Sequence, residues 1–304
     1  MDLYLPIAGV SVNALLIVAL GGLVGVLSGM FGIGGGFLTT PLLIFYGIPP
    51  AVAVASSTTQ ITGASVSGVF AHADRGGVDY RMGGVLVAGG LIGTALGAWA
   101  FAELQSTGQI DTAIALLYVV LLGSIGTLMA RESAASLGLV NVAPPAPARS
   151  RRAWRWVHRL PFRWRFHRSG LFISPLAPLA LGIVSGVLTV LLGIGGGFIV
   201  VPAMIYLLGM TTRVVVGTSL IMVLFVTAAT TLVHAVTTRS VDIVLAALLL
   251  LGSVVGAQWG ARFAQRADPS RLRLALAVLV LCVALRMLLG LTWRPDEIFT
   301  VEAL

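Results

Sequence analysis

The chain has 304 residues, of which 58% are hydrophobic and only 10% are charged, with a mean hydropathy of +1.01. A soluble domain carries about 25% charged residues, so this composition excludes an ordinary soluble domain and indicates a membrane protein. The net charge of +8 comes from arginine alone, because all 19 basic residues are arginines. About half of them fall in one central segment, a pattern typical of a cytoplasmic loop, which argues against nucleic-acid binding.

Apolar runs form two groups of five around a polar, arginine-rich stretch. The first run lacks a basic leading region and is longer than a signal-peptide core, so we predict a retained first span. The runs lie at about 5–30, 37–48, 51–72, 83–102 and 110–130, and then at 171–192, 198–210, 213–236, 243–262 and 272–292. They predict a first transmembrane repeat at 1–130, an Arg/Trp/Pro-rich cytoplasmic loop at 131–170, a second transmembrane repeat at 171–294 and a C-terminal tail at 295–304.

A glycine-rich motif occurs once in each half. A glycine cluster inside an apolar run breaks the helix and leaves backbone groups without partners in their own helix. We therefore predict an all-α polytopic membrane protein with two homologous halves, each containing a helix broken at the motif. The motif is Gly32-Ile33-Gly34-Gly35-Gly36-Phe37 in the first half and Gly193-Ile194-Gly195-Gly196-Gly197-Phe198 in the second. Other pairs keep a spacing of 161–163 residues: Pro41 and Pro202, Ser56-Ser57 and Thr218-Ser219, His72 and His234, and Asp79 and Asp242.

The relative orientation of the halves depends on the short runs at 37–48 and 198–210. If each run crosses the membrane with help from the broken backbone beside it, each half has five crossings and the second half is inverted. Most arginines then lie on the cytoplasmic side, so we favour inverted repeats. The short runs have about 12 apolar residues against the roughly 20 needed to span, so eight crossings with parallel repeats stay open.

The glycine breaks are the first candidate site. Unwound backbone followed by a short helix presents free N–H groups and the positive end of a helix dipole, which bind an anion without a buried lysine or arginine. Paired breaks in two halves indicate a transport site. The competing interpretation is close helix packing, which we favour for Gly89, Gly93, Gly97 and for Gly252, Gly256, Gly260. The predicted substrate-binding glycines are Gly34, Gly35, Gly36, Gly195, Gly196 and Gly197.

The run after each break carries small polar residues at helical spacing. Hydroxyl and amide groups can replace the hydration shell of an anion, although hydrogen bonding between helices is the competing interpretation. Gln60 aligns with Met222, so we expect an asymmetric site. The predicted substrate-binding residues in these runs are Ser56, Ser57, Gln60, Thr218 and Ser219.

Two histidines and two aspartates occupy equivalent places. His72 and His234 end their apolar runs, where they either gate transport or couple it to protons, or stabilise a helix end at the membrane interface. Asp79 and Asp242 are predicted to cap the helices that follow them. No metal-ligand spacing and no nucleotide-binding motif occur, so we predict no metal, no cofactor and no enzymatic activity.

The paired glycine breaks, the small polar run after each and the two homologous halves resemble the TauE/SafE family, whose members are known as sulfite or organosulfur exporters. The resemblance covers about Gly21 to Gly290, except the central loop. It implies a secondary permease for small sulfur-containing anions such as sulfite, sulfoacetate or related organosulfonates, without fixing which of them is carried.

The central loop mixes arginine with tryptophan between residues 151 and 168. We expect it to lie on anionic lipid headgroups. The predicted function is a secondary transporter in the bacterial cytoplasmic (inner) membrane, exporting a small anion. A channel-like or importing permease for another small solute and a non-transporting scaffold stay open, as does a homodimer.

Overall fold

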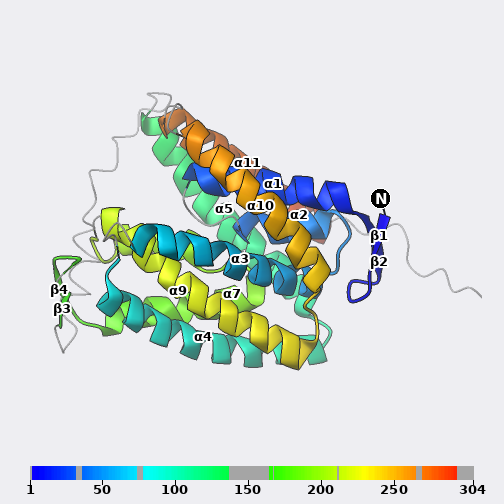
Figure 1. The fold of residues 1–304 in the computed structure, drawn as a ribbon, viewed down its shortest axis with the longest axis horizontal. Coiled ribbons are helices and arrows are strands. Elements are labelled where there is room, and N and C mark those ends of the chain that lie inside the picture. Colours follow the sequence, from blue (N-terminus) through cyan, green and yellow to red (C-terminus); the bar gives the residue numbers. More distant parts are fainter. Residues whose placement is uncertain are drawn as a thin grey trace, which may run out of the picture. The chain divides into compact units, whose positions relative to one another are not determined.

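The structure, a computed structural model, describes residues 2–31, 36–73, 78–136, 164–166, 168–210, 212–264 and 269–292. Most of these residues are helical, and the strands form only two short hairpins (Figure 1). Among the described residues, five helices are long and apolar enough to cross a membrane. The predicted helical polytopic membrane protein is therefore confirmed.

The two halves contain the same elements in the same order. The first half has β1 (Asp2–Leu5), β2 (Val10–Asn13), α1 (Ala14–Phe31), α2 (Gly36–Phe45), α3 (Pro50–Ala73), α4 (Tyr80–Ser106) and α5 (Ile110–Ser136). The second half has β3 (Trp164–Phe166), β4 (Leu171–Ile173), α7 (Leu176–Leu192), α8 (Gly197–Tyr206), α9 (Thr212–Val233), the π-helical turn η1 (His234–Thr238), α10 (Ile243–Ala264) and α11 (Pro269–Thr292). With ten residues each, α2 and α8 are about 15 Å long, half of a bilayer core.

The N-terminal residues differ from the sequence prediction. The first apolar run was expected to be helical from about residue 5, but residues 2–13 form an antiparallel hairpin and α1 begins at Ala14. Leu5 pairs with Val10, so residues 6–9 make the turn, with Gly9 at a φ of 67°. Pro6 lacks an N–H and Gly9 takes a left-handed conformation, so hydrophobicity alone misses this turn.

The helices form two compact units that do not coincide with the sequence halves. One unit contains everything from β1 to α4 together with β3 to α10, and the other contains α5 and α11. In the second unit, Gly126 of α5 packs against Leu281 of α11. Elements of both halves therefore share one body, and the site described below lies entirely in the first unit.

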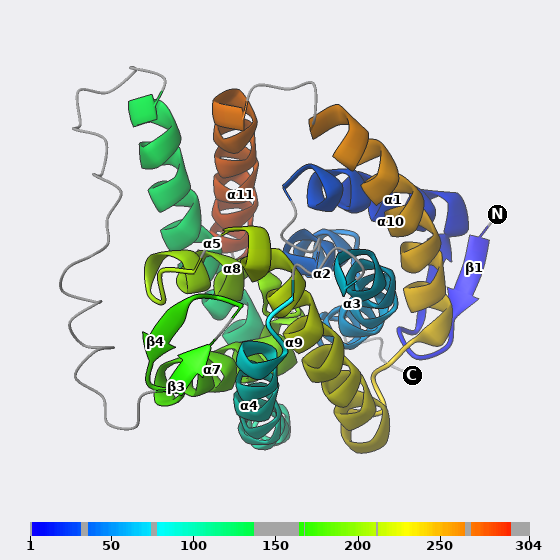
Figure 2. The ribbon, with the colours of Figure 1, turned by 60° about the vertical axis from the view of Figure 1, so that its left-hand side comes forward.

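Within the first unit, one helix of each half packs along a helix of the other half. α1 lies along α10, and α7 lies along α4 (Figures 1 and 2). The contacts are made by glycines: a Cβ on Gly25 or Gly29 would collide with the backbone carbonyl of Ser253 or Ala257. The same holds for Gly89 and Gly93 of α4 against α7, and for Gly252, Gly256 and Gly260 of α10 against α1. This confirms the predicted packing role of the glycines spaced by four.

The central pair of helices is α3 and α9, joined by threonine hydroxyls. Thr59 Oγ1 donates to Thr231 Oγ1 at 3.4 Å, and Thr62 Oγ1 donates to Thr227 Oγ1 at 2.9 Å. Residue numbers rise along one helix as they fall along the other, so the two helices are antiparallel. The first turns of α3 and α9 consequently lie at opposite ends of the pair.

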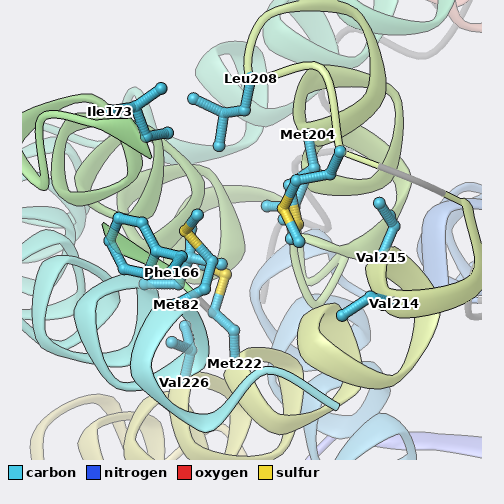
Figure 3. Packing of buried hydrophobic residues seen from close by; sticks show 12 residues of the cluster. Met82, Phe166, Ile173, Met204, Leu208, Val214, Val215, Met222 and Val226 are labelled. Carbon is cyan, nitrogen blue, oxygen red and sulfur yellow. The ribbon is translucent and has the colours of Figure 1, made fainter. Parts of the chain in front are cut away.

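Two hydrophobic clusters, one around each hairpin, are built from equivalent residues. The cluster around β3–β4 contains Phe166, Ile173, Met204, Met82 and Leu86 (Figure 3). Their counterparts in the cluster around β1–β2 are Leu5, Val12, Leu43, Leu245 and Leu249. Each hairpin therefore belongs to the repeated unit, and the two hairpins lie at opposite ends of the first unit (Figure 1).

Candidate functional site

The backbone of the second glycine motif leaves the helix between α7 and α8. Gly193, Gly195 and Gly196 have φ angles of 70°, 72° and 72°, a region in which a side chain costs about 1–2 kcal/mol. The Gly193 N–H still donates to the Thr189 carbonyl at 2.8 Å, which closes the last turn of α7. Gly195, Gly196 and Gly197 are all buried.

The start of α2 meets the break between α7 and α8. The rings of Phe37 and Phe198, the second residues of α2 and α8, are stacked with centroids 4.3 Å apart and an interplanar angle of 9°. A Cβ on Gly36 would lie 3.0 Å from the Ile194 carbonyl oxygen. The N-termini of two short helices are thus brought together, as the paired motifs predict. Gly34 and Gly35 lie outside the described residues.

Free backbone donors line this junction. Within the described part of the chain, no hydrogen bond is donated by the N–H groups of residues 194–198. The first turn of a helix has N–H groups without partners in its own helix, and its dipole places about half a positive charge there. The junction therefore combines unsatisfied donors with positive potential, which is the environment that binds an anion.

Polar side chains without partners surround the same break. Besides Asp242 Oδ2, four buried side-chain oxygens in the first unit make no hydrogen bond in the described structure: Thr40 Oγ1, Ser57 Oγ, Gln60 Oε1 and Ser185 Oγ. Gln60 is 3% exposed, and Thr40, Ser57 and Ser185 are fully buried. Buried polar groups are nearly always hydrogen-bonded, so four exceptions around one break call for a functional explanation.

Contacts with the glycines place these four side chains. A Cβ on Gly193 would lie 3.0 Å from Thr40 Oγ1, and one on Gly196 would collide with Ser185 Oγ. Val54 and Ile61 of α3 contact Gly193 and Gly195, and Ser57 lies between them on the same face of the helix. We call the backbone of residues 193–198 with Thr40, Ser57, Gln60 and Ser185 the polar cluster. We include Gln60 because it follows Ser57 by three residues, nearly one turn of α3.

The other predicted polar residues, Ser56, Thr218 and Ser219, have hydrogen-bond partners elsewhere. Ser56 Oγ accepts the N–H of Asp242 at 3.2 Å, and Thr218 Oγ1 accepts the N–H of Asp79 at 3.0 Å. These reciprocal bonds join the second turns of α3 and α9 to the opposite half. Ser219 Oγ donates to the Val216 carbonyl of its own helix. Ser57 and Gln60 therefore keep an unbonded oxygen, whereas Ser56, Thr218 and Ser219 have partners within the protein.

The predicted capping role of the two aspartates is confirmed. Asp79 Oδ1 accepts the N–H groups of Arg81 and Met82 at the start of α4, both at 3.1 Å. Asp242 Oδ1 accepts the N–H of Leu245 at 3.1 Å in α10. Each carboxylate thus satisfies donors of a first helical turn.

His234 lies at the junction of α9 and η1, and it is fully buried. Its Nε2 is 3.1 Å from the Val190 carbonyl, and its Nδ1 is 3.3 Å from Thr238 Oγ1. Val190 is in the last turn of α7, so an Nε2–H donor satisfies a carbonyl that the break leaves free. The ring also packs edge-on against Phe101. His234 is therefore held inside the protein against the last turn of α7, and the side chain of His72 lies outside the described residues.

Sequence reasoning missed Thr40 and Ser185. Neither is matched by a polar residue in the other half, because Thr40 aligns with Val201 and Ser185 with Val24. A search for polar positions that recur in both halves passes over them. Their positions along the chain could have identified them. Thr40 follows the first glycine motif by one helical turn, and Ser185 precedes the second motif by two to three turns. Among the described residues, no group of three His, Cys, Asp or Glu side chains could hold a metal.

An apolar helical chain whose two halves pack helices against each other, with a helix interrupted inside the second half and buried donors at that break, has the architecture of a membrane transporter. The family model described as "Sulfite exporter TauE/SafE" matches residues 17–287, and the chain belongs to this family.

Curated relatives agree with the membrane transporter class. A "probable membrane transporter protein" of Xylella fastidiosa (strain 9a5c) is 29% identical over 280 residues, which cover 90% of this chain and 93% of the relative. The protein YjnA of Bacillus subtilis (strain 168), which carries the same description, is 29% identical over 275 residues, covering 90% of this chain and 98% of YjnA. No solved structure is significantly similar to the chain.

Proposed function

We propose that the protein is a secondary transporter that carries small sulfur-containing anions, such as sulfite, sulfoacetate or related organosulfonates, out of the bacterial cytoplasm. The observation that carries this proposal is the polar cluster, in which backbone N–H groups and buried hydroxyls have no partner. An oxyanion would accept hydrogen bonds from these donors. The name of the matching family supports a sulfur oxyanion as the cargo.

The donor set suits release as well as binding. The cluster offers hydroxyl groups from Thr40, Ser57 and Ser185, an amide from Gln60 and backbone N–H groups, all of which are neutral. A fixed lysine or arginine would hold an anion tightly and would be costly when the anion leaves. Neutral donors at a helix N-terminus stabilise the anion without that cost.

The membrane potential favours export. Moving one negative charge out of a negative interior yields about 2.3 kcal/mol per 100 mV, and a dianion yields about twice that. A transporter without an ATP site can therefore expel an anion down this electrical gradient. We place the protein in the bacterial cytoplasmic membrane, where such a potential exists.

The antiparallel arrangement of equivalent helices supports an inverted relation of the halves and alternating access around the cluster. The equivalent helices α3 and α9 are antiparallel, as their threonine pairs indicate. A two-fold axis that relates antiparallel spanning helices lies in the membrane plane, so it would exchange the two faces of the membrane. We propose that the halves are related in this way and that transport proceeds by their relative rearrangement.

Counterflow in proteoliposomes tests the proposal. Purified protein is reconstituted with unlabelled sulfite or sulfoacetate inside, and uptake of the labelled anion is followed against protein-free vesicles. We expect saturable uptake that competing sulfur oxyanions inhibit. Flux that rises linearly with concentration would point instead to a channel-like path, and no flux of any sulfur anion would refute the proposed cargo.

A further inference from the structure

His234 supplies the hydrogen bond that the glycine break removes from the end of α7. In an unbroken helix, the N–H of residue 194 would donate to the carbonyl of residue 190. Within the described residues, no backbone N–H donates to the Val190 carbonyl, and the Ile194 N–H donates no hydrogen bond. Instead, His234 Nε2 lies 3.1 Å from the Val190 oxygen. Because a carbonyl oxygen can only accept, Nε2 carries the hydrogen, and the imidazole takes the place of the Ile194 N–H.

Several contacts fix the orientation of the His234 ring. The ring packs edge-on against Phe101 with centroids 4.8 Å apart, and its Nδ1 is 3.3 Å from Thr238 Oγ1. Thr238 Oγ1 is also 2.9 Å from the His234 carbonyl oxygen. The ring is fully buried, so no water replaces these contacts at its surface. It therefore presents Nε2 to Val190 in one defined orientation.

The backbone that carries His234 has an unusual conformation. The turn η1 is π-helical, a rare element that occurs mostly at functional sites. It ends at Arg239, whose N–H donates to the His234 carbonyl. With a φ of 50°, Arg239 is the only residue other than glycine with a positive φ among the described residues. Such a conformation persists only where the surrounding structure fixes it, and here it belongs to the turn that directs His234 at α7.

The helix before His234 contacts the break at a second point. A Cβ on Gly195 would lie 3.3 Å from Cγ2 of Thr227, a residue of α9 about two helical turns before His234. The segment formed by α9 and η1 therefore contacts both the last turn of α7 and the unwound glycines. Ile194, between these two contacts, belongs to the polar cluster.

Loss of the imidazole would change the break in a specific way. A buried carbonyl without a donor is unfavourable, so Val190 would draw the Ile194 N–H back into a helical hydrogen bond. α7 would then extend into the break. An anion bound in the polar cluster would lose the Ile194 N–H as a donor, although every side chain of the cluster would still be present.

We propose that His234 is a positioning residue that keeps the break open and leaves the Ile194 N–H free for the anion. This inference rests on the proposed transport function, and it requires a donor at Nε2 but no proton transfer. Two amide variants separate the donor from the ring. In His234→Gln the side-chain nitrogen lies close to the position of Nε2 and can donate to Val190. In His234→Asn it lies close to the position of Nδ1 and does not reach Val190.

The first measurement compares the KM and the maximal rate of sulfite counterflow in proteoliposomes. We expect His234→Asn to raise KM about tenfold, the effect of losing one hydrogen bond to the anion, while the maximal rate per folded protein stays within about twofold of the wild type. His234→Gln should keep the wild-type KM. An unchanged KM with a lower maximal rate in His234→Asn would indicate a merely structural role and would overturn the proposal, as would an equally raised KM in both variants.

The second measurement does not depend on the cargo. Hydrogen–deuterium exchange in detergent should show the Ile194 amide exchanging about tenfold more slowly in His234→Asn than in the wild type, because it then donates to Val190. Equal or faster exchange would refute the proposal, since the loss of a purely structural contact loosens the segment. If Ile194 becomes protected but no sulfur anion is transported, the proposed cargo fails while the role of His234 at the break stands.

The third measurement decides the question if His234→Asn does not fold. Nitrogen-15 NMR of the wild-type protein labelled in its histidine rings should show one ring with its hydrogen on Nε2 that is absent from His234→Gln. A His234 ring that carries its hydrogen on Nδ1 alone cannot donate to Val190, and this result would overturn the proposal.

Discussion

At the scale of single residues, the candidate site is marked by what its side chains lack. Many buried serines and threonines among the described residues bond to a carbonyl of their own helix, as Ser65 and Thr230 do. Ser57 and Ser185 are as deeply buried and have no such bond. Leaving a buried hydroxyl unsatisfied costs about 1–3 kcal/mol, so selection for stability alone would replace it with alanine.

Replacing these hydroxyls should separate stability from transport. In Ser57→Ala and Ser185→Ala, we expect the thermal stability in detergent to stay the same or to rise by up to about 1–3 kcal/mol, because no hydrogen bond is lost and the penalty of an unsatisfied hydroxyl is removed. Each variant should lower kcat/KM for the anion about tenfold, the effect of one hydrogen bond of about 1.4 kcal/mol. Ser65→Ala on the same helix is the matched control, with unchanged transport. Equal transport by all three variants would show that these two hydroxyls do not bind the anion.

Substitutions of Gly196 test whether the anion approaches the backbone of the break. Its φ of 72° disfavours any side chain by about 1–2 kcal/mol, and a Cβ would collide with the Ser185 hydroxyl. Gly196→Ala should therefore lower both thermal stability and counterflow, and Gly196→Leu should abolish transport while membrane insertion persists. Wild-type flux in Gly196→Leu would show that the anion does not approach this backbone.

At the scale of elements, glycines allow helices of opposite halves to share one body. α4 and α7 approach each other until Gly93 faces the carbonyl of Ile183, and α1 and α10 do the same through Gly256 and Gly22. Small residues are required here because the backbones themselves are in contact. The break between α7 and α8 is held against this framework, since Ser185 of α7 touches Gly196.

Two glycines of α4 allow a test of this packing, one as the test position and the other as its control. A Cβ on Gly93 would collide with the Ile183 carbonyl, whereas a Cβ on Gly84 would have no atom within 4 Å. We expect Gly93→Ala to destabilise the protein by about 1–3 kcal/mol and Gly84→Ala to stabilise it by about 0.5–1 kcal/mol. Thermal unfolding of the purified variants measures both. A stable Gly93→Ala variant would contradict the close approach of α4 and α7.

At the scale of the whole molecule, the two hairpins report on the orientation of the repeats. They lie at opposite ends of the first unit, and the exposed residues Tyr4 and Arg165 occupy equivalent positions on them. The β3–β4 hairpin follows the arginine-rich loop and carries Arg165 and Arg168, so we expect it on the cytoplasmic side by the positive-inside rule. If the repeats are inverted, as we propose, the β1–β2 hairpin lies outside.

Cysteine labelling tests this topology. With the native Cys282 replaced by serine, Tyr4→Cys should react with a membrane-impermeant maleimide in intact cells, and Arg165→Cys should react only after permeabilisation. The retained transport activity of each variant serves as the control for folding. Labelling of both positions from the same side would indicate parallel repeats and would remove the basis for alternating access between inverted halves.

The sequence by itself determined the class of the protein, the duplication, the capping aspartates and the packing glycines, because each depends on local composition or on spacing along the chain. It also indicated Ser57, through its match with Ser219 in the other half, and Gln60, through helical periodicity. Only the tertiary structure decided that Ser56 and Thr218 bond to the opposite half and that Thr40 and Ser185 join the break. It also revealed the oxygen of Asp242 that lacks a donor. These features arise where helices distant in sequence meet, and no local pattern records which neighbour a buried hydroxyl or carboxylate finds there.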